Sequence, residues 1–393
     1  MSINELKGLM ALAEPERNFA PVTLDPSIFN TNKDYEKDNG SLFLQDEPGL
    51  FDTIHRRHPK IWNLYKKLKL QDWDENEFNY SECLVQFSTD SAVDSAPMLK
   101  SLMWQWETDS LAAQNVIPLY APFISSSDLS AAIIEVGRNE VVHAATYSEI
   151  VKYGLPNPKE VLATVMKDQE PLQRLNAVAK VFSEVKAIGL QVSDGRIARD
   201  DPRARDAVML LVFTLFALER LQFTPSFVIT FAYGEAGRYL PAAKAVQKIC
   251  NDEFSVHVEL GREIIRNELS IPVGRESYER IKDRVADIYR EIMMTELTWT
   301  RDYVFTPETK MSGLTCEMVV DFLYYSALDV YTEAQLPYPE DFKVVTTNPV
   351  DYMSEWVDMN LNQASPQEEK TGNYNVGGFK ADAEGMIFDI EGL

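Results

Sequence analysis

The segment from Ala207 to Gly234 constrains the fold of this chain most, because it is long, apolar and interrupted near its middle by charge. Its charged and amide side chains are confined to Glu219, Arg220 and Gln222. A membrane span usually needs about 18 or more uninterrupted apolar residues, and a carboxylate and a guanidinium near the centre disfavour one. The segment is instead typical of a helix that is buried on nearly all sides in a soluble bundle.

Helical patterns separated by short Pro, Gly and Ser clusters cover most of the remaining chain, and strand alternation is scarce. The predicted helices span about 97–116 (beginning at Pro97), 125–154, 158–190, 203–235, 239–268, 275–304 and 311–334. The sequence therefore predicts one all-α domain over residues 58–336. A surface arm, 1–57, precedes it, and a C-terminal segment, 337–393, ends in a polar tail that we expect to be flexible.

The charge of the chain excludes several kinds of partner. There are 61 Asp and Glu against 38 Lys and Arg, which gives a net charge of −23. Such a chain repels phosphate backbones and anionic lipids, so we expect no nucleic-acid partner and no membrane attachment. Three widely spaced cysteines without a CxxC pair suit a reducing compartment. With no secretory signal at the N-terminus, we expect a cytoplasmic protein, or one in the host cytoplasm if the chain is viral.

Two of the four histidines of the chain lie in predicted buried helices, each close to a glutamate. Glu140 precedes His143 by three residues, and Glu253 precedes His257 by four. Residues at these spacings share one face of a helix. Each pair therefore offers a carboxylate and an imidazole to the same metal ion.

Two further predicted helices each carry an inward-pointing acid, Asp109 and Glu219. Buried carboxylates without partners are very costly, so four of them in one bundle require cations. Oxygen-rich sites with one nitrogen per metal suit iron or manganese better than zinc. A single Glu-x-x-His is weak evidence, because a lone histidine more often packs in a core. The two Glu/His pairs and the two single acids lie on four separate predicted helices, in the order expected of such a site. Taken together, they indicate a carboxylate-bridged dimetal centre.

With these residues the chain resembles the small, radical-generating subunit of class I ribonucleotide reductase, from about Pro59 to the C-terminus. The resemblance implies a ferritin-like helical bundle that holds two iron ions, with dimanganese as an alternative. It assigns one metal to Asp109, Glu140 and His143 and the other to Glu219, Glu253 and His257. Tyr147, in HAATY, is implied to carry a stable tyrosyl radical that the centre generates with dioxygen.

The Glu253/His257 spacing is one residue longer than in this family, where three residues separate the pair. A π-type bulge would restore the geometry; if Glu253 were not a ligand, the adjacent Asp252 would replace it. Pro225, within the helix that carries Glu219, removes one backbone hydrogen bond and also favours a local bulge.

The resemblance implies roles for nine further residues. An apolar pocket around the radical would be lined by Phe223, Phe227 and Ile249. Radical transfer would run through Trp73 and its carboxylate partner Asp252, and then through Tyr374 in the tail. The last residues, IFDIEGL, would dock on the partner through Phe388, Asp389 and Glu391.

The implied partner is a large catalytic subunit that uses the radical to reduce ribonucleotides to deoxyribonucleotides, the precursors for DNA replication. The family also suggests a homodimer. A stand-alone di-iron carboxylate oxidase or desaturase is the main alternative, since it shares the six ligands but has no use for Tyr374. Iron storage and a metal-free helical adaptor are weaker alternatives: the first predicts many iron atoms per chain, and the second predicts no stoichiometric metal.

Overall fold

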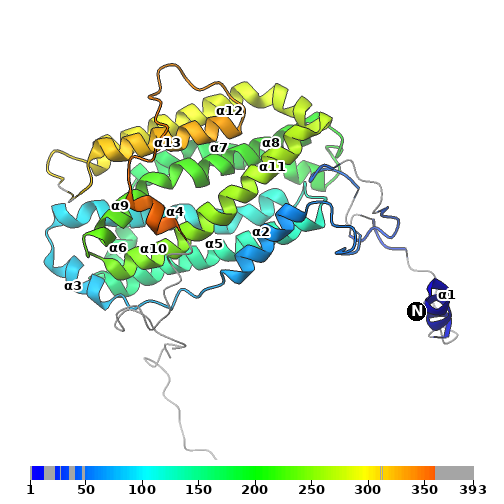
Figure 1. Ribbon diagram of the computed structural model, residues 1–393, viewed down its shortest axis with the longest axis horizontal. Helices are drawn as coiled ribbons and strands as arrows, with labels where there is room; N and C mark the ends of the chain where they lie inside the picture. Colours follow the sequence, from blue (N-terminus) through cyan, green and yellow to red (C-terminus); the bar gives the residue numbers. More distant parts are fainter. Residues whose placement is uncertain are drawn as a thin grey trace, which may run out of the picture.

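The structure is a computed structural model that describes residues 2–12, 23–26, 28–34, 40–46, 49–309, 311 and 313–358. Most of its helices pack side by side as a bundle, and α1 stands apart from it (Figure 1). They are α1 (Ile3–Leu12), α2 (Pro59–Leu70), α3 (Ser81–Thr89), α4 (Ala92–Tyr120), α5 (Ser127–Gly154), α6 (Pro158–Val165), α7 (Glu170–Ser193), α8 (Pro202–Ala217), α9 (Thr224–Glu235), α10 (Leu240–Asp252), α11 (Val258–Ser270), α12 (Pro272–Thr298), α13 (Cys316–Glu333) and α14 (Tyr352–Val357). No strand occurs among the described residues, where an isolated bridge joins Phe43 and Ile124. The all-α prediction is confirmed.

The most apolar segment of the chain forms the centre of the bundle, as its composition predicts. Pro202–Glu235, which comprises α8, a π-helical segment and α9, is apolar enough to cross a membrane, yet 94% of its most apolar 18-residue window is buried inside the protein. It packs against α4, α7, α10 and α12. Burial of each large aliphatic or aromatic side chain stabilises the fold by roughly 1.5–3 kcal/mol, so this segment acts as a core helix.

Side-chain caps define where several helices begin. Ser126 accepts a hydrogen bond from the backbone N–H of Leu129 and starts α5, within the Ser-rich stretch where the sequence predicts a cap. Ser91 likewise accepts from Asp94 and starts α4 at Ala92. The predicted start at Pro97 is therefore wrong. Pro97 lies inside the helix and is buried, so packing outweighs the loss of one backbone hydrogen bond.

The predicted helix over 158–190 is two helices. α6 ends at Val165 and α7 begins at Glu170, with Pro171 in its first turn. Pro171 suits the first turn of a helix because its missing N–H has no intrahelical partner there. A short helix, α1, also forms within the expected N-terminal arm, where the sequence shows little helical periodicity.

Three π-helical segments interrupt long helices: η1 (Leu218–Gln222), η2 (Glu253–His257) and η3 (Trp299–Val304). The backbone N–H of Phe223 bonds to the Leu218 carbonyl five residues earlier, and that of Val258 bonds to Glu253 in the same way. The bulges predicted near Pro225 and between Glu253 and His257 are both present. Each inserts one extra residue into a turn and so rotates the following side chains around the helix axis.

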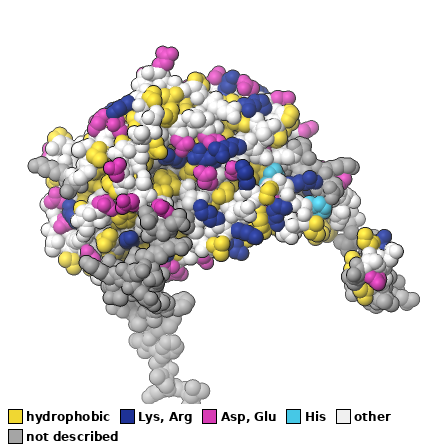
Figure 2. Space-filling model, in the orientation of Figure 1, with side chains coloured by type: hydrophobic (Ala, Val, Ile, Leu, Met, Phe, Trp, Pro, Cys, Tyr) yellow, Lys and Arg dark blue, Asp and Glu magenta, His cyan; other side chains and the backbone are white. Residues whose placement is uncertain are grey.

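Segments at both ends of the predicted bundle pack on its surface. Leu42 and Phe43 are buried, and the carboxylate of Glu268 on α11 accepts hydrogen bonds from the Leu42 N–H, the Ser41 hydroxyl and Arg205. After α13 the chain crosses the bundle to α14, which packs on α9 and α10 (Figure 1). Figure 2 shows acidic and basic side chains interspersed with hydrophobic ones over the face in view.

A substitution at Gly274, in the first turn of α12, would test how closely α11 packs against α12. A Cβ at this position would lie 2.0 Å from the carbonyl oxygen of Glu268, a backbone atom that has little freedom to move. We expect Gly274→Ala to lower the free energy of unfolding by about 1–3 kcal/mol, the usual cost of overpacking. Chemical denaturation measures the change.

Val273→Ala is the matched control, because Val273 neighbours Gly274 and is exposed. Its free energy of unfolding should stay within about 0.5 kcal/mol of the parent. Equal effects of the two substitutions would show that the short Cβ distance at Gly274 does not constrain the helix pair.

Candidate metal centre

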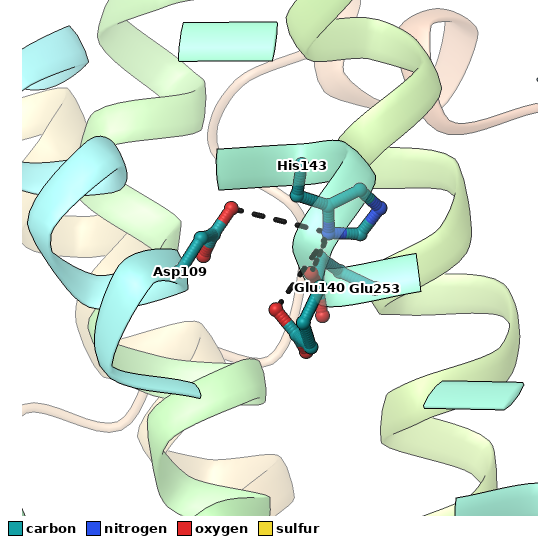
Figure 3. A group of neighbouring side chains, drawn as sticks. All are labelled: Asp109, Glu140, His143 and Glu253. Atoms are coloured by element: carbon teal, nitrogen blue, oxygen red, sulfur yellow. Dashed lines mark ion pairs between the residues drawn. The ribbon is translucent and has the colours of Figure 1, made fainter. Parts of the chain in front are cut away.

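Three helical segments bring a first group of acidic and imidazole side chains together in the core of the bundle. Asp109 comes from α4, Glu140 and His143 from α5, and Glu253 from the start of η2, and their side chains point toward one another (Figure 3). The Nδ1 atom of His143 lies 2.9 Å from Glu253 Oε1, 3.8 Å from Glu140 Oε2 and 3.9 Å from Asp109 Oδ2. These four buried groups surround one point and can hold a metal ion.

A second group lies directly beside the first. It comprises Glu140, Glu219, Glu253 and His257, all buried. The Nδ1 atom of His257 lies 2.8 Å from Glu253 Oε2 and 3.2 Å from Glu140 Oε1. Glu140 and Glu253 belong to both groups, and each directs one oxygen to each imidazole. Glu140 and Glu253 could therefore contribute an oxygen to each of two metal positions.

The two π-helical segments place these side chains. In a regular α-helix, residues four apart are displaced by about 40° around the axis, whereas a π turn holds nearer to 4.4 residues. Glu253 and His257, at the two ends of η2, therefore face the same way and meet at 2.8 Å. Glu253, rather than Asp252, points into the site, and Glu219 reaches it from η1.

Several ligating atoms of the site have no partner among the described residues apart from one another. These are both carboxylate oxygens of Asp109, Glu140 and Glu253 and Nδ1 of His143 and His257, among which the closest contacts are the 2.8 and 2.9 Å ion pairs of Glu253 with the two imidazoles. Buried acceptors without donors cost free energy that a cation would recover. The set of four carboxylates and two imidazoles fits two divalent ions of the iron or manganese type, with one nitrogen for each.

The electrostatics agree with a site that is short of positive charge. Burial and the neighbouring Glu140 raise the pKa of Asp109 well above its usual range, and burial and Glu253 do the same for the pKa of Glu219. Burial alone would lower the pKa of His257, but the adjacent carboxylates outweigh it and raise this pKa to about 10. Without a metal, the cluster therefore retains protons at neutral pH.

Asp252 connects the site to an indole on its outer side. Its Oδ2 atom accepts a hydrogen bond from Trp73 Nε1 at 2.7 Å and lies 3.2 Å from His143 Nε2. The rings of Trp73 and His143 are stacked, with centroids 5.9 Å apart. The family resemblance implies that Asp252 is the carboxylate partner of Trp73, and the structure places both side chains beside His143.

Two residues of this network are missing from the sequence-based prediction. Asn139 accepts from His257 Nε2 at 3.0 Å and donates to Asp252 Oδ2 at 3.0 Å, and Gln71 donates to Asp252 Oδ1 at 2.9 Å. Asn139 thus keeps the proton of His257 on Nε2 and leaves Nδ1 for a metal. The sequence did contain one signal for Asn139: it is an amide side chain in a predicted buried helix, directly before the candidate ligand Glu140.

The predicted radical residue and its pocket are buried near the cluster. Tyr147 is 1% exposed, and its hydroxyl has no hydrogen-bond partner among the described residues. Burial, and after it Asp109, raise the pKa of Tyr147 well above its usual value. Phe223, Phe227 and Ile249 are also fully buried, with the two phenylalanine rings stacked 5.4 Å apart.

The predicted tail residues Tyr374, Phe388, Asp389 and Glu391 lie outside the described residues, which end at Asp358. Their roles in radical transfer and docking stay predictions.

Comparisons with known proteins agree with this geometry. Residues 51–349 match the family model described as "Ribonucleotide reductase, small chain". The ribonucleoside-diphosphate reductase subunit beta of Haemophilus influenzae is 22% identical over 331 residues, which cover 81% of this chain and 86% of that protein. The ribonucleoside-diphosphate reductase 1 subunit beta of Escherichia coli O157:H7 is 20% identical over a region that covers 83% of this chain and 89% of that protein.

Solved structures share the fold. A putative class I ribonucleotide reductase from Bacillus halodurans superposes with a TM-score of 0.63 at 18% identity, covering 76% of this chain and 99% of that one. The ribonucleotide reductase R2 subunit from Clostridium botulinum superposes with a TM-score of 0.62 at 17% identity, covering 77% of this chain and 89% of that one. The predicted ferritin-like bundle is confirmed.

The family model covers well over half of the chain, and the chain therefore belongs to the ribonucleotide reductase small-chain family. This confirms the predicted class I small subunit and the classification of the protein as part of an oxidoreductase.

Glu140 offers a test of the metal site, because it reaches both ligand groups. We expect Glu140→Gln to weaken binding of manganese(II) by at least about tenfold, since even partners of ligands usually contribute 10–100-fold. Without metal the same variant should be more stable than the parent, because one buried negative charge has been removed. Metal analysis after dialysis and thermal unfolding with and without manganese measure the two effects.

Glu135→Gln is the matched control on the same helix, where Glu135 forms an ion pair with Arg138 outside the cluster. It should leave metal content unchanged. Equal metal content in both variants would contradict the assignment of Glu140 to the site.

Metal binding should also release protons at pH 7. His257 has its pKa raised to about 10, so in the metal-free protein it is protonated below that pH and must lose its proton to bind a metal. Affinity should therefore rise with pH between about 6 and 9. Calorimetry in two buffers of different ionisation enthalpy measures the released protons, and identical heats in both buffers would contradict the prediction.

Proposed function

We propose that this small subunit generates and holds a stable radical on Tyr147 for use by a large catalytic subunit. The observation that carries the proposal is the position of the Tyr147 phenol. It is buried, without a described hydrogen-bond partner, one helical turn after His143, and Asp109 is the carboxylate that most affects its pKa. A phenol in this position can be oxidised without exposing the product to solvent.

The cofactor in this proposal is a pair of iron ions. Asp109, Glu140 and His143 hold one, and Glu219, Glu253 and His257 hold the other. When bound, the ions supply the one-electron oxidant in a reaction with dioxygen. Two manganese ions are the alternative, since the same ligand types suit both metals. A structural neighbour, from Streptococcus sanguinis, is titled dimanganese(II)-NrdF; its TM-score is 0.55 at 16% identity, covering 77% of this chain and 99% of that one.

The residues around Tyr147 govern its oxidation. The phenol gives up one electron to the oxidant and loses its proton in the same oxidation. Burial keeps the phenol protonated until then, as its raised pKa requires. Phe223, Phe227 and Ile249 exclude water and reductants from the product.

Transfer to the partner begins at Trp73. The indole N–H donates to Asp252, so loss of an electron from Trp73 can be coupled to movement of its proton along that hydrogen bond. In the proposal, Tyr374 then relays the radical equivalent, and Phe388, Asp389 and Glu391 dock on the large subunit. That subunit reduces ribonucleotides to deoxyribonucleotides.

The size of the cavity at the metal site disfavours a stand-alone oxidase or desaturase. A cavity of about 40 Å³ lies beside Glu219 and His257 and is otherwise lined mainly by apolar side chains such as Leu215 and Ile264. This volume accommodates water or dioxygen but is too small for an organic substrate.

The proposal includes the arrangement in which the subunit works. It acts as a homodimer in the cytoplasm, or in the host cytoplasm if the chain is viral. Residues 58–336 form the metal-binding bundle, 1–57 the N-terminal arm, and 337–393 the segment that connects to the partner.

Electron paramagnetic resonance on metal-free protein given ferrous iron and then oxygen tests the proposal. We expect a tyrosyl signal with about two irons per chain, as a ferritin-like dimetal site predicts. Tyr147→Phe should abolish this signal while leaving the iron content unchanged, because Tyr147 is no ligand.

Tyr120→Phe is the control, since Tyr120 is another fully buried tyrosine beside the cavity. It should retain the signal. Iron at this stoichiometry without a tyrosyl signal, both with iron and with manganese and its oxidant, would overturn the radical proposal in favour of an oxidase.

A further inference from the structure

Arg174, on α7, is a positive charge buried in the bundle outside the metal centre. The residue is 1% exposed, and its guanidinium lies between the indoles of Trp104 and Trp299, with Cζ 3.6 and 3.7 Å from the two ring centroids. It donates two hydrogen bonds to the carboxylate of Glu296 on α12, Nε to Oε1 at 2.9 Å and Nη2 to Oε2 at 2.5 Å. Arg174 therefore forms a buried ion pair whose planar head is held on both faces and along one edge.

Stability alone does not account for this pair. Burial lowers the pKa of Arg174 and raises that of Glu296, because each charge loses solvation in the core. Apolar residues of similar volume in place of a buried ion pair often make a protein equally or more stable. A buried pair can instead select one arrangement of the chain around it. The third contact of Arg174 indicates which arrangement this pair selects.

That contact is with Gln222, the last residue of η1. Nη2 of Arg174 donates to the backbone carbonyl of Gln222 at 3.3 Å. The Gln222 amide Nε2 in turn donates to the Arg174 carbonyl at 2.9 Å and to Glu296 Oε1 at 3.4 Å. The Gln222 side chain is fully buried. The ion pair therefore fixes both the backbone and the side chain of Gln222.

The position of Gln222 matters because Glu219 lies in the same π-helical turn. A π-bulge is one extra residue in a helix, and moving it along the chain would rotate every residue between its old and new positions by about 100° around the axis. Gln222 can keep its hydrogen bonds to Arg174 and Glu296 in only one of these registers. With Gln222 fixed, Glu219 stays on the face of the helix that points to the second group.

Arg220, also in η1, makes another contact that holds this turn. Its Nε donates to Asp329 Oδ2 at 2.8 Å and its Nη1 to Ser326 Oγ at 2.7 Å, both on α13. These bonds are made at the end of a long side chain, which can follow a shift of the backbone by changing rotamers. Arg174 bonds directly to the backbone of η1 and so constrains the turn more closely.

We propose that Arg174 is a positioning residue for Glu219: together with Glu296 it fixes Gln222 and keeps η1 in the register that directs Glu219 to the second group. The inference rests on the proposed assignment of Glu219 to a metal ion. Arg174 is not a ligand and acts through Gln222. Loss of the ion pair should therefore change the affinity of the metal site more than the stability of the fold.

The paired replacement Arg174→Met with Glu296→Leu tests this role, because it removes both charges and leaves neither buried alone. Metal-free full-length chain is titrated with manganese(II), and free manganese(II) is followed by electron paramagnetic resonance. We expect the metal-free variant to unfold in one cooperative transition near or above the temperature of the parent. The second manganese(II) ion should bind at least about tenfold more weakly, as is usual when a residue that orients a ligand is lost, and the first ion should be affected less.

The matched control is Arg284→Met with Glu184→Leu. Arg284 and Glu184 form an arginine–glutamate pair between the same two helices, α12 and α7. This pair is partly exposed, and no hydrogen bond joins it to Gln222. The control should leave the affinities for both manganese(II) ions unchanged.

Gln222→Met is the second variant. It retains the ion pair of Arg174 and Glu296, so no buried charge is left without its partner, but it removes the two hydrogen bonds of the Gln222 amide. It should weaken the second manganese(II) ion in the same direction. It also keeps the test decisive if the paired replacement fails to fold.

A double-mutant cycle with Glu219→Ala shows whether the pair acts through Glu219. Once Glu219 has been removed, the replacement of Arg174 and Glu296 should weaken manganese(II) binding no further. Parental affinity in both the paired variant and Gln222→Met would overturn the positioning role, and so would an equal loss with and without Glu219. A parent that binds fewer manganese(II) ions than the two of a dimetal site would instead overturn the proposed metal assignment.

Discussion

The burial of negative charge in the bundle core is the constraint on which the rest of the structure depends. Asp109, Glu140, Glu219 and Glu253 converge in a region without solvent. Four carboxylates at such distances repel one another and raise the pKa values of most of the group. The two imidazoles supply part of the missing positive charge, and divalent cations could supply the rest.

The π-helical segments show how the bundle adapts to this requirement. A regular helix would displace Glu253 and His257 from each other by about 40° around its axis. The extra residue in η2 reduces that displacement, and Glu219 also lies in a π-helical segment, η1. Such bulges give up regular backbone hydrogen bonds, and tight packing of the surrounding core offsets that cost.

Asp252 connects the metal centre with the outer part of the protein. It contacts Trp73, His143 and Asn139, so the orientation of a ligand imidazole and the proton on an indole depend on the same carboxylate. Glu235 on α9 binds the indole of Trp356 in a similar way. Both indoles are therefore held in place by hydrogen bonds to carboxylates.

The sequence by itself determined the helical class, the buried segment around Glu219 and the ligand types, because apolar periodicity and Glu/His spacing report directly on one helix at a time. It located the bulges at Pro225 and before His257, but it misplaced the start at Pro97 and fused α6 with α7. Only the tertiary structure decided that Glu140 and Glu253 are shared, that Asn139 joins the network, and that α14 packs on α9. These depend on contacts between residues far apart in the chain, which no local pattern encodes.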